Sequence, residues 1–230
     1  MQQKPVLTMT LTGEVYLPIR LIYQVRDMTE LQQQFAKLSC MNFDTAKDRW
    51  VWLYQDEAKA LKFTKSYAAL PKETRPIVLG SFYQHDSQEM HLDVGSVDRA
   101  SAAVVFFDKH IRRLVSEVTH CAIYNRILEQ CEHPGPNFDS LFGTVNTADI
   151  DAKLATKVAK LKSLMKSGLL QGVIQDTSFE LVESFPVHFY EDGIDLFKSS
   201  MTMHETVAIK RWKGDKTFNM GKLIHQIVQR

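Results

Sequence analysis

The segment from Ile77 to Gly95 alternates apolar and polar residues on both sides of Asp86-Ser87-Gln88. Two runs with period two, separated by a short polar break, are typical of a β-hairpin with one buried face. A shift of one residue would turn the apolar face to solvent, so the pattern fixes the register. The apolar face comprises Val78, Gly80, Phe82, Met90, Leu92 and Val94. The polar face comprises Tyr83, His85, Glu89, His91 and Asp93.

Four other segments combine a capping residue with apolar residues at helical spacing, the pattern of an amphipathic helix. Asp27 or Thr29 caps the first, and Ser96 caps a second that runs to His110. Asn146 and Asn219 cap the last two. The expected apolar stripes are Leu31, Phe35 and Leu38; Ala100, Ala103, Val104 and Phe107; Ile150, Leu154, Val158, Leu161 and Met165, with Gly168 as the stop; and Leu223, Ile224, Ile227 and Val228.

Further strands are expected where apolar residues alternate or run together in short segments. Arg49 to Tyr54 is bulky on both faces, as in a covered central strand. A helix is expected from Asp56 to Leu70, and a hairpin turn at Lys213-Gly214-Asp215-Lys216. The other expected strands are Val6 to Thr12, Val15 to Val25, the start of Val115 to Leu128, Phe179 to Tyr190, and Met201 to Trp212.

These elements predict an α+β fold, with a mixed but mainly antiparallel sheet covered by amphipathic helices. Without the first strand and the second helix, the N-terminal order can be threaded onto a ferredoxin-like β-α-β-β-α-β core. We expect an N-terminal α+β part at 1–131 and a Pro/Gly-rich connection at 132–145. A C-terminal part at 146–230 packs with it or forms its own unit.

Composition narrows the class of protein. Of the residues, 44% are hydrophobic and 24% charged, which excludes a disordered chain. The formal net charge is +1, so an extended nucleic-acid footprint is not expected, although a local basic patch is. Three cysteines are too few for a disulfide framework, and neither a signal peptide nor a membrane span is visible. We expect a cytoplasmic protein without membrane contact.

The common catalytic fingerprints are missing from the sequence. It contains no GxGxxG, GxxxxGK[ST], HExxH or GxSxG motif. These absences remove the recognisable nucleotide-binding, zincin and α/β-hydrolase classes, but not enzymes with scattered residues. We therefore assign no catalytic residue and no cofactor from the sequence.

The polar face of the 77–95 hairpin is the densest group of metal-ligand side chains. Alternation places His91 and Asp93 on one side, and pairing across the turn brings His85 close to Glu89. Imidazole and carboxylate together suit zinc or another divalent transition metal. His85, His91 and Asp93 are therefore the candidate ligands, although a solvated hairpin face carries such residues anyway.

Two other sets of residues are weaker candidates for a metal site. His120, Cys121, Cys131 and His133 fit no zinc spacing, and adjacent strand residues point to opposite faces. Asp48, Glu57 and Lys59 resemble the acid and ExK of metal-dependent nucleases of the PD-(D/E)xK type. In that family the ExK lies in a strand, whereas Glu57 and Lys59 are expected at a helix start, where such pairs are common.

A basic and aromatic cluster suggests a partner instead. The stretch from Lys210 to Lys216 places four cations and a tryptophan at the expected hairpin tip, where they could hold phosphates and stack on a base. Lysines on the polar side of the 146–168 helix add to the charge, although any solvated helix carries them. The candidate binding residues are Lys210, Arg211, Trp212, Lys213 and Lys216.

The sequence thus favours a binding or assembly protein that contacts a protein or nucleic-acid partner. One alternative is a metal-dependent hydrolase or nuclease. Another is a small-molecule-binding domain with a pocket lined by Trp50, Trp52 and Tyr54, although a core strand explains those residues equally.

Overall fold

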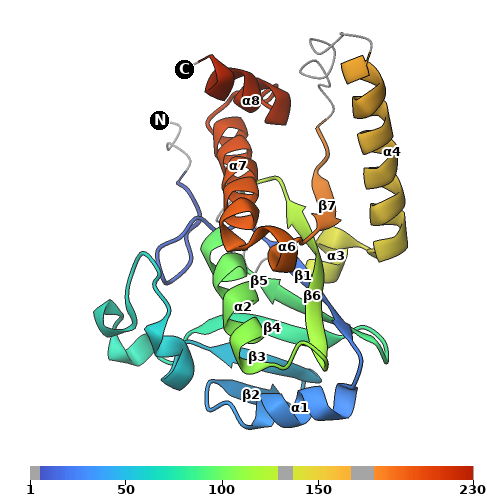
Figure 1. Cartoon of the computed structure of the whole chain (residues 1–230). Helices are drawn as coiled ribbons and strands as arrows, with labels where there is room; N and C mark the ends of the chain where they lie inside the picture. Colours follow the sequence, from blue (N-terminus) through green and yellow to red (C-terminus); the bar gives the residue numbers. More distant parts are fainter. Residues whose placement is uncertain (1–5, 129–136, 167–178, 230) are drawn as a thin grey trace.

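The protein is built on one antiparallel sheet. The computed structural model describes residues 6–128, 137–166 and 179–229, and within them seven strands pair in the order β2-β3-β4-β5-β1-β6-β7 (Figure 1). The predicted α+β class is confirmed. The strands are β1 (Ile19–Val25), β2 (Met41–Asp44), β3 (Arg49–Leu53), β4 (Val78–Gln84), β5 (Glu89–Val94), β6 (Ser116–Tyr124) and β7 (Val182–Pro186).

Helices of very different length lie between these strands and after the last of them. No helix among the described residues is both long and apolar enough to cross a bilayer. The α-helices are α1 (Met28–Ala36), α2 (Val97–His110), α3 (Phe138–Phe142), α4 (Thr147–Lys166), α6 (Phe189–Asp192), α7 (Ile194–Trp212) and α8 (Met220–Val228). Short 3-10 turns are η1 (Asp56–Ala60), η2 (Tyr67–Ala69) and η3 (Lys72–Thr74).

The centre of the sheet has the ferredoxin-like arrangement. Strand β5 lies between β4 and β1, and β1 lies between β5 and β6, all antiparallel to their neighbours. Helix α2 links β5 to β6, two parallel strands with β1 between them, whereas α1 follows β1 and leads into β2 at the edge of the sheet. The β2–β3 hairpin follows α1 and extends the sheet beyond β4.

One face of the sheet is covered by α1 and α2. Phe35 of α1, Phe82 of β4 and Phe107 of α2 are mutually in contact, with ring centroids 4.8–6.0 Å apart. Trp52 of β3 is fully buried against Phe107. Both helices begin where predicted, because the side chains of Asp27 and Ser96 accept hydrogen bonds from the first-turn amides.

The opposite face of the central strands is polar. We call it the polar sheet face and define it by Arg20, Arg49, Ser81, Tyr83, His91 and Asp93. Helix α3 packs near it over β6. The predicted hairpin register is confirmed, since Phe82 pairs with Leu92 and Tyr83 with His91.

The N-terminal and C-terminal parts contribute to the same sheet. Strand β7 pairs with β6 along its length, and α7 packs alongside α2 (Figure 1). Phe197 and Met201 of α7 belong to the main hydrophobic core with residues from β1 to β6. The connection between these parts includes α3; residues 129–136 lie outside the described residues.

The strand predicted from Met201 to Trp212 is wrong, because this segment is the second half of α7. Its buried residues fall at helical spacing once the helix is followed from its start at Ile194. The short segments Met201 to Met203 and Val207 to Ile209 alternate in a way that is also typical of a strand. The buried positions are Phe197, Met201, His204, Val207 and Ala208.

The helix predicted from Asp56 to Leu70 is also wrong, because only η1 and η2 form there. Asp56 has a φ of +45°, which no α-helix accommodates. The buried Tyr54 hydroxyl then donates to the Leu61 carbonyl at 2.9 Å and accepts from the Tyr67 amide at 3.0 Å. These bonds hold the segment in an irregular path over the core.

Other boundaries differ by less. Residues 6–12 form no strand, and Met9 makes only an isolated bridge to Val15. The predicted strand at Val15 to Val25 begins only at Ile19, after Pro18. Strand β2 was not predicted, and the predicted strand at Phe179 to Tyr190 ends as β7 at Pro186 and continues into α6.

Two predicted apolar stripes are only partly buried. In α4, Ile150 is buried, whereas Leu154 and Val158 are more than a third exposed. In α8, Leu223 is buried, whereas the other three residues of its stripe are 40–75% exposed. The side chains of Leu161 and Met165, and Gly168 itself, lie outside the described residues.

Candidate metal centre

The β4–β5 turn fixes three ligand-type residues at one end of the polar sheet face. The amide of His85 donates to the carbonyl of Glu89 at 3.0 Å, which closes the hairpin across Asp86 to Gln88. The Gln88 carbonyl also accepts from the amide of Val25, at the end of β1, at 2.7 Å. The turn is therefore held by the pairing of the hairpin itself and by β1.

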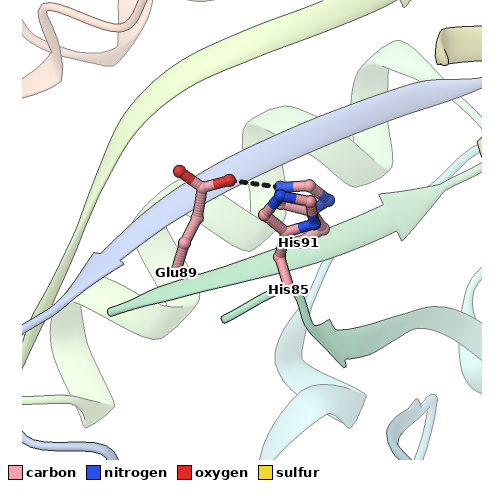
Figure 2. A group of neighbouring side chains, drawn as sticks. All are labelled: His85, Glu89 and His91. Atoms are coloured by element: carbon pink, nitrogen blue, oxygen red, sulfur yellow. Dashed lines mark hydrogen bonds and ion pairs between the residues drawn. The ribbon is translucent and has the colours of Figure 1, made fainter. Parts of the chain in front are cut away.

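The three side chains on this end lie together (Figure 2). One ligand atom from each of His85, Glu89 and His91 falls within 4.8 Å of the others. The two imidazole rings stack with centroids 4.6 Å apart and planes 16° apart. Nε2 of His91 lies 2.6 Å from Oε1 of Glu89. The hairpin thus brings two imidazoles and a carboxylate to one point.

Burial prepares His91 to act as a ligand. Its side chain is 6% exposed, and burial is the main cause that lowers its pKa. Arg20 lowers the pKa further, whereas the hydrogen bond to Glu89 opposes the shift. At neutral pH the ring is therefore uncharged and has a nitrogen lone pair, the form that binds a metal ion.

The spacing is close to what zinc requires. Zinc–nitrogen and zinc–oxygen bonds of about 2.0–2.2 Å in a tetrahedron place the ligand atoms roughly 3.3 Å apart. His85 is exposed and can rotate to close the remaining distance. A cation between Nε2 of His91 and Glu89 would take the place of the hydrogen bond between these groups, so neither side chain needs to move far.

Asp93, which the sequence offered as a ligand, has another partner. Arg20 crosses from β1 and donates from Nε and Nη2 to its two carboxylate oxygens, at 2.7 and 2.8 Å. Nη2 of Arg20 also donates to Asp139 of α3 at 2.8 Å. Burial raises the pKa of Asp93 and Arg20 opposes that rise. Glu89 takes the place in the histidine group that the sequence suggested for Asp93.

Beside His85, Glu89 and His91, which we call the histidine group, lies a row of polar side chains on neighbouring strands. Arg49 pairs with Tyr83, and Tyr83 pairs with His91, in the register of β3, β4 and β5. These three residues therefore lie side by side on the polar sheet face. Nη1 of Arg49 donates to the Tyr83 hydroxyl at 3.1 Å.

The basic and aromatic stretch lies at the C-terminal end of α7 and in the turn after it, not at a hairpin tip. Arg211 donates to the Phe218 carbonyl at 2.9 Å and lies 3.5 Å from the Phe179 ring centre. Trp212 packs against the main core. Lys210, Lys213 and Lys216 are exposed, and cations near a helix C-terminus also stabilise its dipole. The predicted role in binding a partner stays a prediction.

The three residues of the nuclease-like set, Asp48, Glu57 and Lys59, each have a different structural environment. Glu57 accepts from the amides of Ser39 and Cys40 at 3.1 and 2.9 Å, and so supports the chain between α1 and β2. Lys59 pairs with Asp56 at 3.4 Å. Asp48 lies between β2 and β3 with a φ of +48°.

The other two candidate sets also have structural roles. His120 contacts Asp151 of α4 at 3.2 Å, whereas Cys121, on the opposite face, packs against Met201. Cys131 and His133 lie outside the described residues. The remaining set is the predicted aromatic pocket: Trp52 and Tyr54 are fully buried in the core, and Trp50 is half-buried between Phe35 and Phe43.

Sequence reasoning named Glu89 as a neighbour of His85 but did not select it as a ligand. The available signal was the spacing His-x3-Glu-x-His around a three-residue turn, which pairs the first two residues and places the third on the same face. The chain was also compared with protein-family models, curated proteins and solved structures, and none of the three comparisons found a match.

Proposed function

We propose that this protein binds a divalent transition metal ion, zinc foremost, through His85, Glu89 and His91. The observation that carries the proposal is their convergence within 4.8 Å at the fixed end of the β4–β5 hairpin. Two imidazoles and one carboxylate are a ligand set found in zinc enzymes. Glu89 and His91 lie on the paired strand β5, and site residues on strands are held more rigidly than residues on loops.

Three protein ligands leave a coordination position for water or substrate, as in catalytic zinc sites. A metal-dependent hydrolase is therefore the enzyme class that fits this ligand set best. An ion held there would lower the pKa of a bound water and so supply a nucleophile near neutral pH. The exposed side of the group, at His85, is the side from which a substrate would approach.

The cytoplasm remains the proposed location. Its support is that Cys40 and Cys121 are free thiols, buried in the core. Burial raises the pKa of the Cys40 thiol to about 12, with a further contribution from Glu57. Such thiols are inert packing groups, as expected in a reducing compartment.

The proposal predicts saturable zinc binding by the untagged, chelator-treated protein in isothermal titration calorimetry. His85→Ala and Glu89→Gln should each weaken binding by at least the roughly 10–100-fold that loss of a supporting partner costs in metal sites. Both positions are at least partly exposed, so the fold should survive. His225→Ala, which removes an exposed histidine on α8, is the matched control. Equal zinc affinity in all four proteins would place the metal elsewhere and refute the assignment.

A further inference from the structure

A cavity of about 310 Å³ opens over the polar sheet face, and its lining includes Tyr83, the cross-strand neighbour of His91. Strands β3, β4 and β5 form its floor, and Asn137 and Phe138 at the start of α3 form one wall. Its volume lies at the lower end of the range for small-molecule sites. Polar lining residues include Tyr16, Arg49, Ser81, Tyr83, Asp93 and Arg99.

Arg49 is held in place at this cavity with part of its hydrogen-bonding capacity unused. Its Nε donates to Asp44 at 3.0 Å, and its Nη1 donates to Ser81 and Tyr83, both at 3.1 Å. Its Nη2 makes no hydrogen bond to the described residues. The Tyr83 hydroxyl accepts from Arg49, which leaves its own proton to donate. Two donors are therefore positioned side by side by the strand register.

Arg99 provides a second cation on the cavity lining. Its side chain is 9% exposed and donates to the Val78 carbonyl at 3.1 Å and to the Thr12 hydroxyl at 2.8 Å. Its buried Nε has no hydrogen-bond partner among the described residues, and the nearest carboxylate oxygen, on Glu14, is 3.8 Å away. This Nε is enclosed by protein atoms, so Arg99 contributes its positive charge to the cavity lining and not a free donor.

The charges that line the cavity favour an anion. Among the described lining residues, the acidic one is Asp93, and both of its oxygens are occupied by Arg20. Arg49 and Arg99 then contribute the remaining lining charge, while Asp44 and Glu14 lie outside the lining. Guanidinium groups bind phosphate and carboxylate with two parallel hydrogen bonds more readily than other side chains do.

We infer that this cavity binds a small molecule through an oxyanion, a phosphate or a carboxylate, which Arg49 and Tyr83 hold. The inference does not depend on the proposed metal ion. Tyr83 is nevertheless the cross-strand neighbour of both Arg49 and His91. A molecule anchored at Arg49 would therefore extend along the polar sheet face toward the histidine group.

The test is NMR titration of metal-free, isotope-labelled protein with inorganic phosphate and, separately, acetate at constant ionic strength. Saturable shifts are expected for amides of β3 and β4, with the tighter ion identifying the anion class. Arg49→Gln should weaken binding by about tenfold or more, as expected for hydrogen bonds to a charged group. Tyr83→Phe should weaken it several-fold while it preserves the ring and the fold.

Lys109→Gln, which removes an exposed cation at the end of α2 and outside this cavity, should bind as the wild type does. The inference is overturned if neither ion gives saturable shifts at β3 and β4. It is equally overturned if Tyr83→Phe and Arg49→Gln, both folded by circular dichroism, bind with wild-type affinity. Because the protein is metal-free throughout, neither result depends on zinc binding.

Discussion

Arg20→Ala is expected to lower the free energy of unfolding by about 3–5 kcal/mol, the usual cost of breaking a buried ion pair. Arg20 and Asp93 are 3% and 6% exposed, and the guanidinium satisfies both carboxylate oxygens. Without it, Asp93 remains buried between β4 and β1 with no charge to compensate it. Urea denaturation followed by circular dichroism measures the loss.

Two variants distinguish this effect from a general loss of charge. Arg26→Ala breaks an ion pair with Glu117 in which Arg26 is 44% exposed, and such pairs contribute at most about 1 kcal/mol. The double variant Arg20→Met, Asp93→Leu should recover most of the lost stability, because apolar replacement of a whole buried pair is often neutral. If Arg20→Ala lowers the free energy of unfolding no more than Arg26→Ala does, the buried Arg20–Asp93 pair does not stabilise the sheet as proposed.

Acidification from pH 6.5 to about 4 should destabilise the protein through His204 of α7. Burial lowers the pKa of His204 from 6.5 to about 4. Between these values the unfolded chain binds a proton that the folded protein excludes, so stability falls as the pH falls. At roughly 1.4 kcal/mol per pKa unit, His204 alone accounts for about 3 kcal/mol by pH 4.

The structure around His204 explains this shift and provides the control. Nδ1 donates to Oδ1 of Asn125 at 3.1 Å, and the ring stacks on Phe185. Glu183 lies 3.7 Å away, but burial raises its pKa, so it compensates little for a proton on the ring. His204→Gln should flatten the pH dependence of unfolding below 6.5. An unchanged slope in this variant would mean that other groups carry the acid sensitivity.

The β4–β5 hairpin could be predicted because its pattern and its final environment agree. One face is apolar and meets α1 and α2, while the other is polar, so alternation alone selected the register. The starts of α1, α2, α4 and α8 could be predicted from their capping residues, because a cap depends on local sequence. These local signals also placed His85, Glu89 and His91 on one face.

Elements that depend on tertiary packing were harder to predict. Helix α7 packs partly on α2 and partly against Phe218 and Leu223, and the helical spacing of its buried residues is visible only when the segment is read from Ile194. Its short alternations then imitate a strand. Segment 56–70 is held by the Tyr54 hydroxyl, a contact that no periodicity reveals.

The candidate site likewise combines residues that the local pattern predicts with residues that only the pairing of distant strands reveals. Asp93 and Glu89 are equivalent by alternation, since each is two residues from His91 on the same face. The choice between them depends on Arg20, which reaches Asp93 from a strand 73 residues away in the chain. Pairing of β1 with β5 was therefore the missing information. Arg49 became a candidate for the same reason, through the pairing of β3 with β4.

The most direct test of the proposed centre is a crystal structure of the zinc-loaded protein, with anomalous diffraction recorded on both sides of the zinc absorption edge. The account predicts an anomalous peak at about 2.0–2.2 Å from a nitrogen of His85, a nitrogen of His91 and an oxygen of Glu89. Crystals soaked in zinc whose anomalous peaks lie only away from this hairpin would contradict it.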